Sequence, residues 1–414
     1  MTTSRSLATF QSKVQAFAQR VLWPGAKPSE ITVGRLPSGS YNRILTASFR
    51  KQGFYAEFVP AEHLIIRIPR EDRAEDLGGM IELDKDLALL NFIDQRTTIP
   101  APRVVQYDMT HGNEFGRKHM VQTHLRGEPI LNFYNRLGPE VRCKIASELG
   151  GIYRQLLNTQ SRIAGIPALP AGNGPLRIAT FPSAGPAKAI DYCHAGNTTE
   201  PIPLLQLAEG MLEKQKLATL ISLRSRGHEM ATIKAQYDGL INVARGKAAA
   251  GHFDNVPYSL YHIDLNPRNV LAKEHAAPDD RRLTGIIDWD WACFMAAFMA
   301  AKPPRWLWMW SDEDGSDDDE DDETHANDVP EDPQNQKIKR VFEDAAGPLY
   351  RRFAYDPFYH LARGVFRGAL CPTRHSWDRD MLRDTMEEWN EMVSEKGMGE
   401  WREETEGLAS LGVD

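Results

Sequence analysis

The strongest constraint in this sequence is the segment Tyr261–Leu271, in which polar residues at fixed spacing lie between two short apolar runs. His262, Asp264 and Asn269 follow the pattern H-x-D-x-x-x-x-N. After a hydrophilic hairpin, a further apolar run ends at Asp288. Any fold that contains this segment must place several polar side chains on one loop between two apolar strands.

Short strands are predicted at Ser259–His262, Val270–Ala272 and Leu283–Ile287, because these apolar runs lie between turn signals. The loop between the first two strands then directs Asp264 and Asn269 into one cavity. Asp288 reaches the same region from the end of a neighbouring strand.

These residue types suit phosphoryl transfer, which needs a carboxylate for the attacking hydroxyl and oxygen ligands for magnesium. Asp264 supplies the first, and Asn269 with Asp288 supplies the second, as in the catalytic loop and metal-binding aspartate of kinases. Taken singly, His262 fits a structural histidine and the Asp-Leu-Asn-Pro run fits a capped turn. The ordered combination favours catalysis, whereas Asp290 fits a second metal ligand and a structural acid equally.

The sequence resembles the aminoglycoside phosphotransferase and choline kinase superfamily, specifically its fungal branch, from about Ile31 to Pro304. The catalytic loop and Ile287-Asp288-Trp289 carry most of the resemblance. It implies an α+β, bilobal protein kinase-like fold with a small antiparallel-sheet N-lobe and a mainly helical C-lobe. It also implies ATP and Mg²⁺ as cofactors, His262 and Asp264 as the start of the catalytic loop, and Asn269 and Asp288 as magnesium ligands. In the first lobe it implies a phosphate-covering turn at Gly39, Ser40, Tyr41 and Asn42.

The first lobe departs from the protein-kinase pattern. The segment Gly34–Gly39 is not G-x-G-x-x-G, and Arg67 stands where kinases have a strand lysine. Its guanidinium can hold phosphate, and counting back from Ile99-Pro100 gives Asp86 as its helix partner, with Glu82 one turn earlier. The alternative is that Arg67 is a surface strand residue. By position only, Gln122 and His124 lie in the hinge strand that contacts adenine.

Three regions are expected: an N-terminal helical segment at 1–30, a nucleotide-binding N-lobe at 31–125 and a catalytic, substrate-binding C-lobe at 126–414. The N-lobe pattern predicts three strands within Ile31–Ile68, one helix ending at Arg96 and two strands at 104–107 and 118–122. The C-lobe pattern predicts helices at 139–157, 202–250, 335–367 and 377–397, and a disordered acidic insertion at 311–333.

A small hydroxyl-bearing molecule is the expected substrate, because the chain lacks an A-P-E sequence and has a long helical segment before Asp264. The alternating Trp306, Trp308 and Trp310 fit an aromatic cage for an ammonium group, but core packing is preferred. Three acidic residues on the last predicted helix could bind an amine group of the substrate, but their helical spacing favours a solvent-exposed helix face: Glu387, Glu388 and Glu391. The alternative function is a pseudokinase, a nucleotide-binding regulatory or scaffolding module without turnover.

The net charge of -8 comes from ten acidic residues between Asp312 and Glu323, outside which 47 acidic residues face 49 basic ones. Nucleic acid is therefore not an expected partner, and no apolar run reaches the ~18 residues of a membrane helix. Four scattered cysteines favour the cytoplasm. The first 29 residues contain no acid, which leaves a mitochondrial address open, although Phe10, Val14, Phe17 and Val21 favour a packed amphipathic helix. The oligomeric state is left open.

Overall fold

The computed structural model describes residues 11–36, 42–51, 62–69, 83–170, 174, 176–181, 189–191, 202–222, 227–275, 282–310, 328–370, 379–392 and 394. The chain divides into two compact units. Unit 1 comprises Met1–Glu128 with Asn269–Lys273 and Thr284–Asp290, and unit 2 comprises the rest. The predicted boundary at 125–126 placed both later segments in the C-lobe, so the structure moves Asn269 and Asp288 into the unit that contains the N-lobe.

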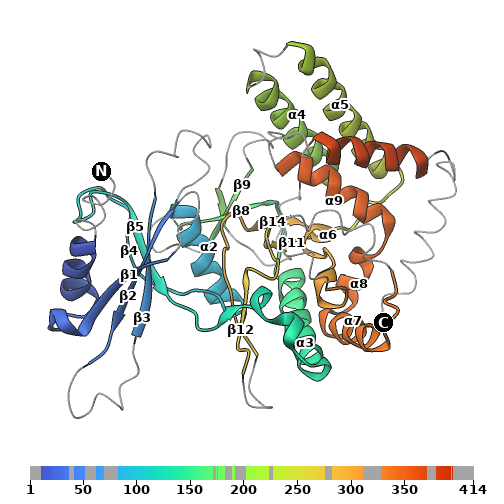
Figure 1. Cartoon of the computed structure of the whole chain (residues 1–414). Helices are drawn as coiled ribbons and strands as arrows, with labels where there is room; N and C mark the ends of the chain where they lie inside the picture. The colour runs from blue at the N-terminus through green and yellow to red at the C-terminus, as the bar shows by residue number, and fades with distance from the viewer. Residues whose placement is uncertain are drawn as a thin grey trace. The chain divides into compact units, whose positions relative to one another are not determined.

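Unit 1 is built on a five-stranded antiparallel sheet in the order β1-β2-β3-β5-β4 (Figure 1). Its strands are β1 Ile31–Arg35, β2 Asn42–Phe49, β3 Glu62–Pro69, β4 Val104–Asp108 and β5 His119–Thr123. Helix α2 spans Leu83–Arg96, and the short helix η2 spans Pro28–Glu30. These elements agree with the strands and the helix predicted from the sequence.

The two faces of this sheet are covered by different elements, because successive side chains of a strand point to opposite sides. Leu45, Ala47 and Ile66 lie on one face, in a core cluster with Val14 and Phe17 of the N-terminal segment. Arg67 is offset by one position and faces the other side, where it contacts α2. Figure 1 shows the N-terminal helix in dark blue and α2 in light blue on opposite sides of the sheet.

The N-terminal segment is a helix at 11–17 that continues as the π-helical turn η1, Ala18–Leu22. Val14 and Phe17 are buried as predicted, but Val21 is 38% exposed. The Trp23 amide donates a 2.8 Å hydrogen bond to the Ala18 carbonyl, five residues back, and this wider turn rotates Val21 off the buried face. Phe10 lies outside the described residues.

Unit 2 contains a six-stranded sheet in the order β10-β9-β8-β14-β11-β7. Its strands are β7 Gln160–Ser161, β8 Gly165–Ala168, β9 Arg177–Thr180, β10 Ala189–Asp191, β11 Tyr258–Tyr261 and β14 Cys293–Ala296. A separate three-stranded sheet, formed almost entirely by residues of unit 1, has the order β13-β12-β6, with β6 at Glu128–Pro129, β12 at Val270–Ala272 and β13 at Leu283–Ile286. Of the larger sheet, only β11 was predicted, so the second lobe contains more strand than its sequence indicated.

The helices of unit 2 are more interrupted than predicted. They are α3 Pro139–Asn158, α4 Leu204–Ser222, α5 Gly227–Ala249, α6 Ala297–Ala300, α7 Pro333–Ala346, α8 Pro348–Ala354, α9 Pro357–Leu370 and a last helix at 379–392. Short helices are η5 Ile130–Asn132, η6 Tyr134–Arg136 and η8 Arg305–Leu307. The predicted helix at 202–250 is two helices, and that at 335–367 is three.

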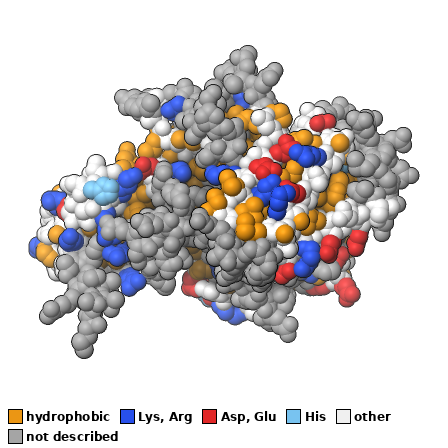
Figure 2. All heavy atoms as spheres, turned by 90° about the horizontal axis from the view of Figure 1, so that it is seen from above, with side chains coloured by type: hydrophobic (Ala, Val, Ile, Leu, Met, Phe, Trp, Pro, Cys, Tyr) orange, Lys and Arg blue, Asp and Glu red, His pale blue; other side chains and the backbone are white. Residues whose placement is uncertain are grey.

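The pair α4 and α5 forms an antiparallel hairpin (Figure 1) joined by ion pairs between Lys216 and Asp238 and between Arg245 and Glu209. Figure 2 views the molecule from above and shows basic and acidic side chains next to one another, interspersed with apolar ones. The acidic run Asp312–Glu323 lies outside the described residues. Among the residues that the structure describes, no helix is long and apolar enough to cross a membrane.

Candidate functional site

Arg67 is the centre of the candidate site in unit 1. It lies on β3 opposite Ile44 of β2 and Met120 of β5, and only 8% of its surface is exposed. Its Nη2 atom lies 3.1 Å from Asp86 Oδ2 and 2.8 and 2.7 Å from the two carboxylate oxygens of Asp290. Arg67 is therefore not a surface residue, and Asp86, found by counting, is one of its two partners.

Arg67 is a single cation between the two carboxylates of Asp86 and Asp290, and this excess of negative charge shifts the pKa values of Arg67 and Asp86. Burial disfavours the charged guanidinium, but the Asp290 and Asp86 carboxylates outweigh this, so the pKa of Arg67 is raised. Burial, together with the Asp290 charge, raises the pKa of Asp86 to about 7, against the attraction of Arg67. The Asp288 charge also raises the pKa values of both Arg67 and Asp86, so a third carboxylate lies near this pair.

Three predicted nucleotide-contacting residues carry a buried polar atom that has no hydrogen-bond partner among the described residues: Asn42 Oδ1, Arg67 Nε and Gln122 Oε1. The strand register places all three on one sheet face, because Asn42 and Gln122 are each two positions from a residue paired with Arg67. Diagonal neighbours of this kind lie about 7–8 Å apart. Buried polar groups are usually paired, so each of these three atoms leaves a hydrogen-bonding group open to a polar ligand on this face.

The order of these residues along the sheet suits an elongated ligand. Asn42 pairs with Pro69 at the C-terminal end of β3, and Gln122 pairs with Ile65, which is nearer the N-terminal end of the same strand. Arg67 lies between them. A molecule following this face would meet an amide at either end and a guanidinium between the two.

The loop after β13 carries Asp288 and Asp290 in unit 1. The Ile287 amide donates to the Asn269 carbonyl at 2.9 Å, which joins the backbones beside the two predicted magnesium ligands. Trp289 is buried, and its indole N–H donates to the Ile286 carbonyl at 2.9 Å. Asp288 has a φ of 61°, a left-handed conformation that is uncommon for residues other than glycine and is often found at functional sites.

The start of the catalytic loop lies in unit 2, after β11, which pairs with β14 and β7. His262 is buried and Asp264 is exposed. Asn266 Nδ2 lies 2.5 Å from Asp264 Oδ1, and Asn266 Oδ1 accepts from the Arg268 amide at 3.0 Å. Asn266 thus orients the predicted catalytic carboxylate, a role that sequence reasoning missed although the Asp-Leu-Asn-Pro run is a turn signal.

Other predicted residues are placed less directly. Gly39, Ser40 and Tyr41 lie outside the described residues. His124 is exposed, its amide donates to the His63 carbonyl at 3.1 Å, and the two imidazole centroids are 6.3 Å apart. His63 is four positions before Arg67 on β3, so the ring contact places the His124 side chain on the sheet face that carries Arg67.

The tryptophan run packs rather than enclosing a cavity. Trp308 is fully buried against Phe342 of α7, with ring centroids 5.9 Å apart. The Trp306 and Trp310 rings each lie 5.3 Å from Tyr134 and 6.4 Å from each other, so the three rings fill the space between them. This agrees with the preferred prediction that the tryptophan run packs in the core, although the run begins in the short helix η8 and not in a strand.

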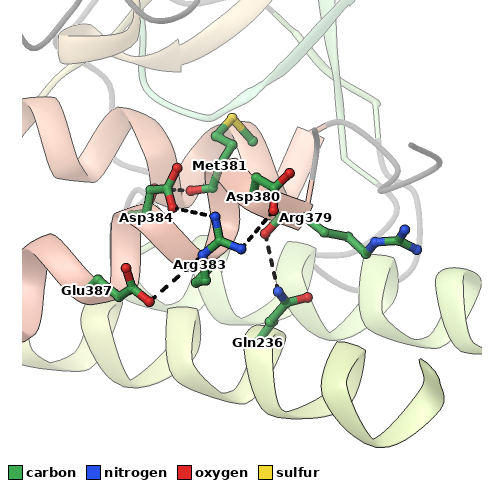
Figure 3. Close-up of polar contacts among 8 residues, drawn as sticks. Gln236, Arg379, Asp380, Met381, Arg383, Asp384 and Glu387 are labelled. Atoms are coloured by element: carbon green, nitrogen blue, oxygen red, sulfur yellow. Dashed lines mark hydrogen bonds and ion pairs between the residues drawn. The ribbon is translucent and has the colours of Figure 1, made fainter. Parts of the chain in front are cut away.

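The late acidic residues lie on the helix at 379–392, which Figure 3 shows beside α5. Gln236 Nε2 donates to the Arg379 carbonyl at 3.2 Å and ties the two helices together. The Glu387 side chain is 65% exposed and lies 3.8 Å from Arg383, while Glu388 lies 3.5 Å from His360. Glu387 thus fits the solvated face that the sequence favoured.

The oxygen ligands near Asp288 suit a magnesium ion held on a nucleotide. Within the described part of the chain, no three His, Cys, Asp or Glu side chains form a ready-made metal site. Magnesium on a nucleotide needs only one or two protein oxygen ligands, since phosphates and water supply the others. The Asp288 carboxylate and the Asn269 amide oxygen are of that type, and their backbones are joined at Ile287, so the residues fit the ion.

Comparison with known proteins identifies the family. The model of the phosphotransferase enzyme family, APH, matches residues 49–299, which is more than half of the chain. The protein therefore belongs to this family of kinase-like phosphotransferases. Together with the sheet and helices described above, this confirms the predicted bilobal protein kinase-like α+β fold.

Similar solved structures share little sequence. ADP-bound aminoglycoside phosphotransferase APH(2'')-Ib is 13% identical with a TM-score of 0.48, covering 91% of this chain and 96% of that one. The streptomycin-ATP-APH(2'')-IIa ternary complex is 11% identical with a TM-score of 0.44, covering 94% and 97%. Choline kinase from Cryptosporidium parvum Iowa II is 11% identical with a TM-score of 0.42, covering 95% and 98%. The search of curated proteins finds no match.

Proposed function

We propose that this protein transfers the γ-phosphoryl group of ATP, with Mg²⁺, to a hydroxyl group of a small molecule. The observation that carries the proposal is the sheet face with Asn42, Arg67 and Gln122, whose unpartnered buried atoms follow one another along an elongated path. A nucleotide has the length to follow this path: an amino group of its base can donate to Gln122 Oε1 and a phosphate oxygen can accept from Arg67 Nε, with the phosphates toward the Asn42 end. Gly39 and Ser40 precede Asn42 in the chain and would cover the phosphates, and His124 would lie beside the base.

Each remaining residue has a distinct proposed role. The Asp264 carboxylate accepts the proton of the substrate hydroxyl as its oxygen attacks the γ-phosphorus and the bond to the ADP oxygen breaks. Asn266 and His262 hold that loop. Asn269 and Asp288 would hold magnesium, which would neutralise the charge that develops on the phosphate oxygens. Arg67, paired with Asp86, steadies the nucleotide phosphates.

The Asp264 and Asp288 roles predict different defects. Asp288→Ala is expected to remove binding of magnesium nucleotide, because it deletes a charged metal ligand. Asp264→Asn is expected to leave nucleotide binding largely intact and to lower turnover by about two to four orders of magnitude, the scale of a lost general base. Equal loss of nucleotide affinity in the two variants would contradict these assignments.

The direct test is ADP release by the full chain with magnesium-ATP against pools of small metabolites. Stimulation by one pool that is absent in Asp264→Asn would support a small-molecule kinase and would begin to identify its substrate. Nucleotide binding with no stimulation by any broad pool would favour a module that binds nucleotide without turnover.

A further inference from the structure

Asp290 contacts Arg67 more closely than Asp86 does. Both Asp290 oxygens lie within 2.8 Å of Arg67 Nη2, whereas the single Asp86 contact is 3.1 Å long. The Arg67 side chain is 10% exposed, and those of Asp86 and Asp290 are 15% and 20% exposed. Short contacts between buried, oppositely charged groups are the strong class of hydrogen bond.

All three contacts converge on one nitrogen of the guanidinium. Nη2 carries only two of its five N–H groups, and the carboxylates occupy both. Nε is buried without a hydrogen-bond partner in the described part of the chain. Two carboxylates acting at one nitrogen fix the direction of the planar group, and the Nε–H donor remains available to an acceptor such as a phosphate oxygen.

The position of Asp290 in the chain links Arg67 to the metal-binding loop. It lies two residues after Asp288, and the intervening Trp289 is buried and hydrogen-bonded to Ile286. The positive φ of Asp288 turns the backbone sharply at that point. A shift of Asp288 is therefore transmitted over two residues to the carboxylate that holds Arg67.

We propose that Asp290 is the main positioning residue for Arg67 and couples it to the magnesium-binding loop, rather than serving as a second metal ligand. The inference rests on the proposed function, because it assumes that Arg67 meets the nucleotide phosphates. Asp86 then has the smaller share in orienting the guanidinium. The carboxylate that kinases place on the helix is here supplied mainly by the loop after β13.

A double-mutant cycle tests this. Asp290→Asn, Arg67→Met and the double variant are compared for the dissociation constant of ADP with magnesium by calorimetry, which needs no turnover. Asp290→Asn alone is expected to weaken ADP binding about tenfold, the scale of one charged hydrogen bond. In the Arg67→Met background the same change is expected to have an effect below about twofold, because no guanidinium remains to be positioned.

Asp86→Asn is the matched control and is expected to weaken binding less than Asp290→Asn. Arg67→Lys provides a second variant if Asp290→Asn does not fold. It keeps a cation for both carboxylates but lacks the second donor nitrogen, so it should fold like wild type and bind ADP about tenfold more weakly. Thermal unfolding of each variant separates loss of fold from loss of binding.

Several results would overturn the inference. These are an equal effect of Asp290→Asn in both backgrounds, a larger effect of Asp86→Asn, wild-type affinity in Arg67→Lys, or a raised magnesium requirement in Asp290→Asn that persists without Arg67. The last would make Asp290 a metal ligand. If wild-type protein does not bind ADP, the proposed function fails and the inference with it. If wild type binds ADP and the cycle is additive, only the inference fails.

Discussion

Lys247 on α5 is fully buried, and replacing it by methionine should remove a large pH dependence of stability. Its Nζ donates a 2.6 Å hydrogen bond to the Phe358 carbonyl and lies 5.0 Å from the ring centres of Phe358 and Trp389. Burial lowers the pKa of Lys247 to about 7, although the charges of Asp356 and Glu388 oppose this. Methionine has a similar length, accepts the same aromatic contacts and carries no proton.

The sign and size follow from proton linkage. Between pH 7 and about 10, the unfolded chain keeps a proton on this amine that the folded chain has released, so the stability of wild type rises with pH. For a pKa of about 7 when folded and roughly 10.4 when unfolded, the gain between pH 7 and 9.5 is about 3 kcal/mol. Lys247→Met should lack this gain and should be the more stable protein at pH 7 by about 1–3 kcal/mol, after allowance for the lost hydrogen bond.

Urea unfolding of the full chain at pH 7 and pH 9.5, followed by tryptophan fluorescence, measures the difference. Trp389 lies beside Lys247 and reports on this part of unit 2. Lys214→Met, at an exposed position on α4, is the control and should leave the pH dependence unchanged. A stability difference between Lys247→Met and wild type that is the same at both pH values would refute the reasoning.

Two further predictions concern His252 and Gly127. Burial, aided by the charge of Lys247, lowers the pKa of His252 to about 4, and its ring stacks on Phe358 at 3.8 Å. As the pH falls, the unfolded chain binds this proton at a higher pH than the folded chain does. The free energy of unfolding of wild type, measured with urea, should therefore fall by about 2–3 kcal/mol relative to that of His252→Phe between pH 7 and 4.5. A difference between the two proteins that stays constant over this pH range would contradict the prediction. Gly127 has a φ of 112°, and a Cβ there would lie 2.3 Å from Thr284 Oγ1 and 2.8 Å from the Ala272 carbonyl. Gly127→Ala should lower the free energy of unfolding by about 2–4 kcal/mol. Thermal unfolding of both variants tests this: Gly112→Ala, in open space, should be neutral, and equal melting temperatures of the two variants would reject the steric argument.

The sequence predicted the sheet of unit 1 well, because its strands alternate and are bounded by turns. It predicted much less of the larger sheet in unit 2, whose strands carry no comparable signal. Cys293–Ala296 is buried at every position and therefore shows no alternation, and Gly165–Ala168 contains both glycine and proline. Cys293–Ala296 pairs with β11 and with β8, which lie far away in the sequence, and a local pattern does not encode such pairing.

In the site, spacing located Arg67, Asp86 and Asp288 but could not rank the partners of Arg67. The Asp290 contact joins residues 223 positions apart in sequence, and it depends on a left-handed φ at Asp288 that no residue type announces. Asn266 was missed for a different reason. Its turn signal was present, but only the 2.5 Å contact with Asp264 shows that the turn orients the predicted base.

The cost of this arrangement argues against a purely structural role. A buried arginine between two carboxylates, an aspartate with a raised pKa, a left-handed aspartate and three unpartnered polar atoms each lower the stability of the folded protein. Apolar residues would fill the same space at less cost, so the group is best explained by a ligand that completes it. That reasoning supports nucleotide binding and does not by itself require turnover. The proposed turnover would depend instead on Asp264, an exposed carboxylate that Asn266 contacts at 2.5 Å, and the Asp264→Asn variant tests it.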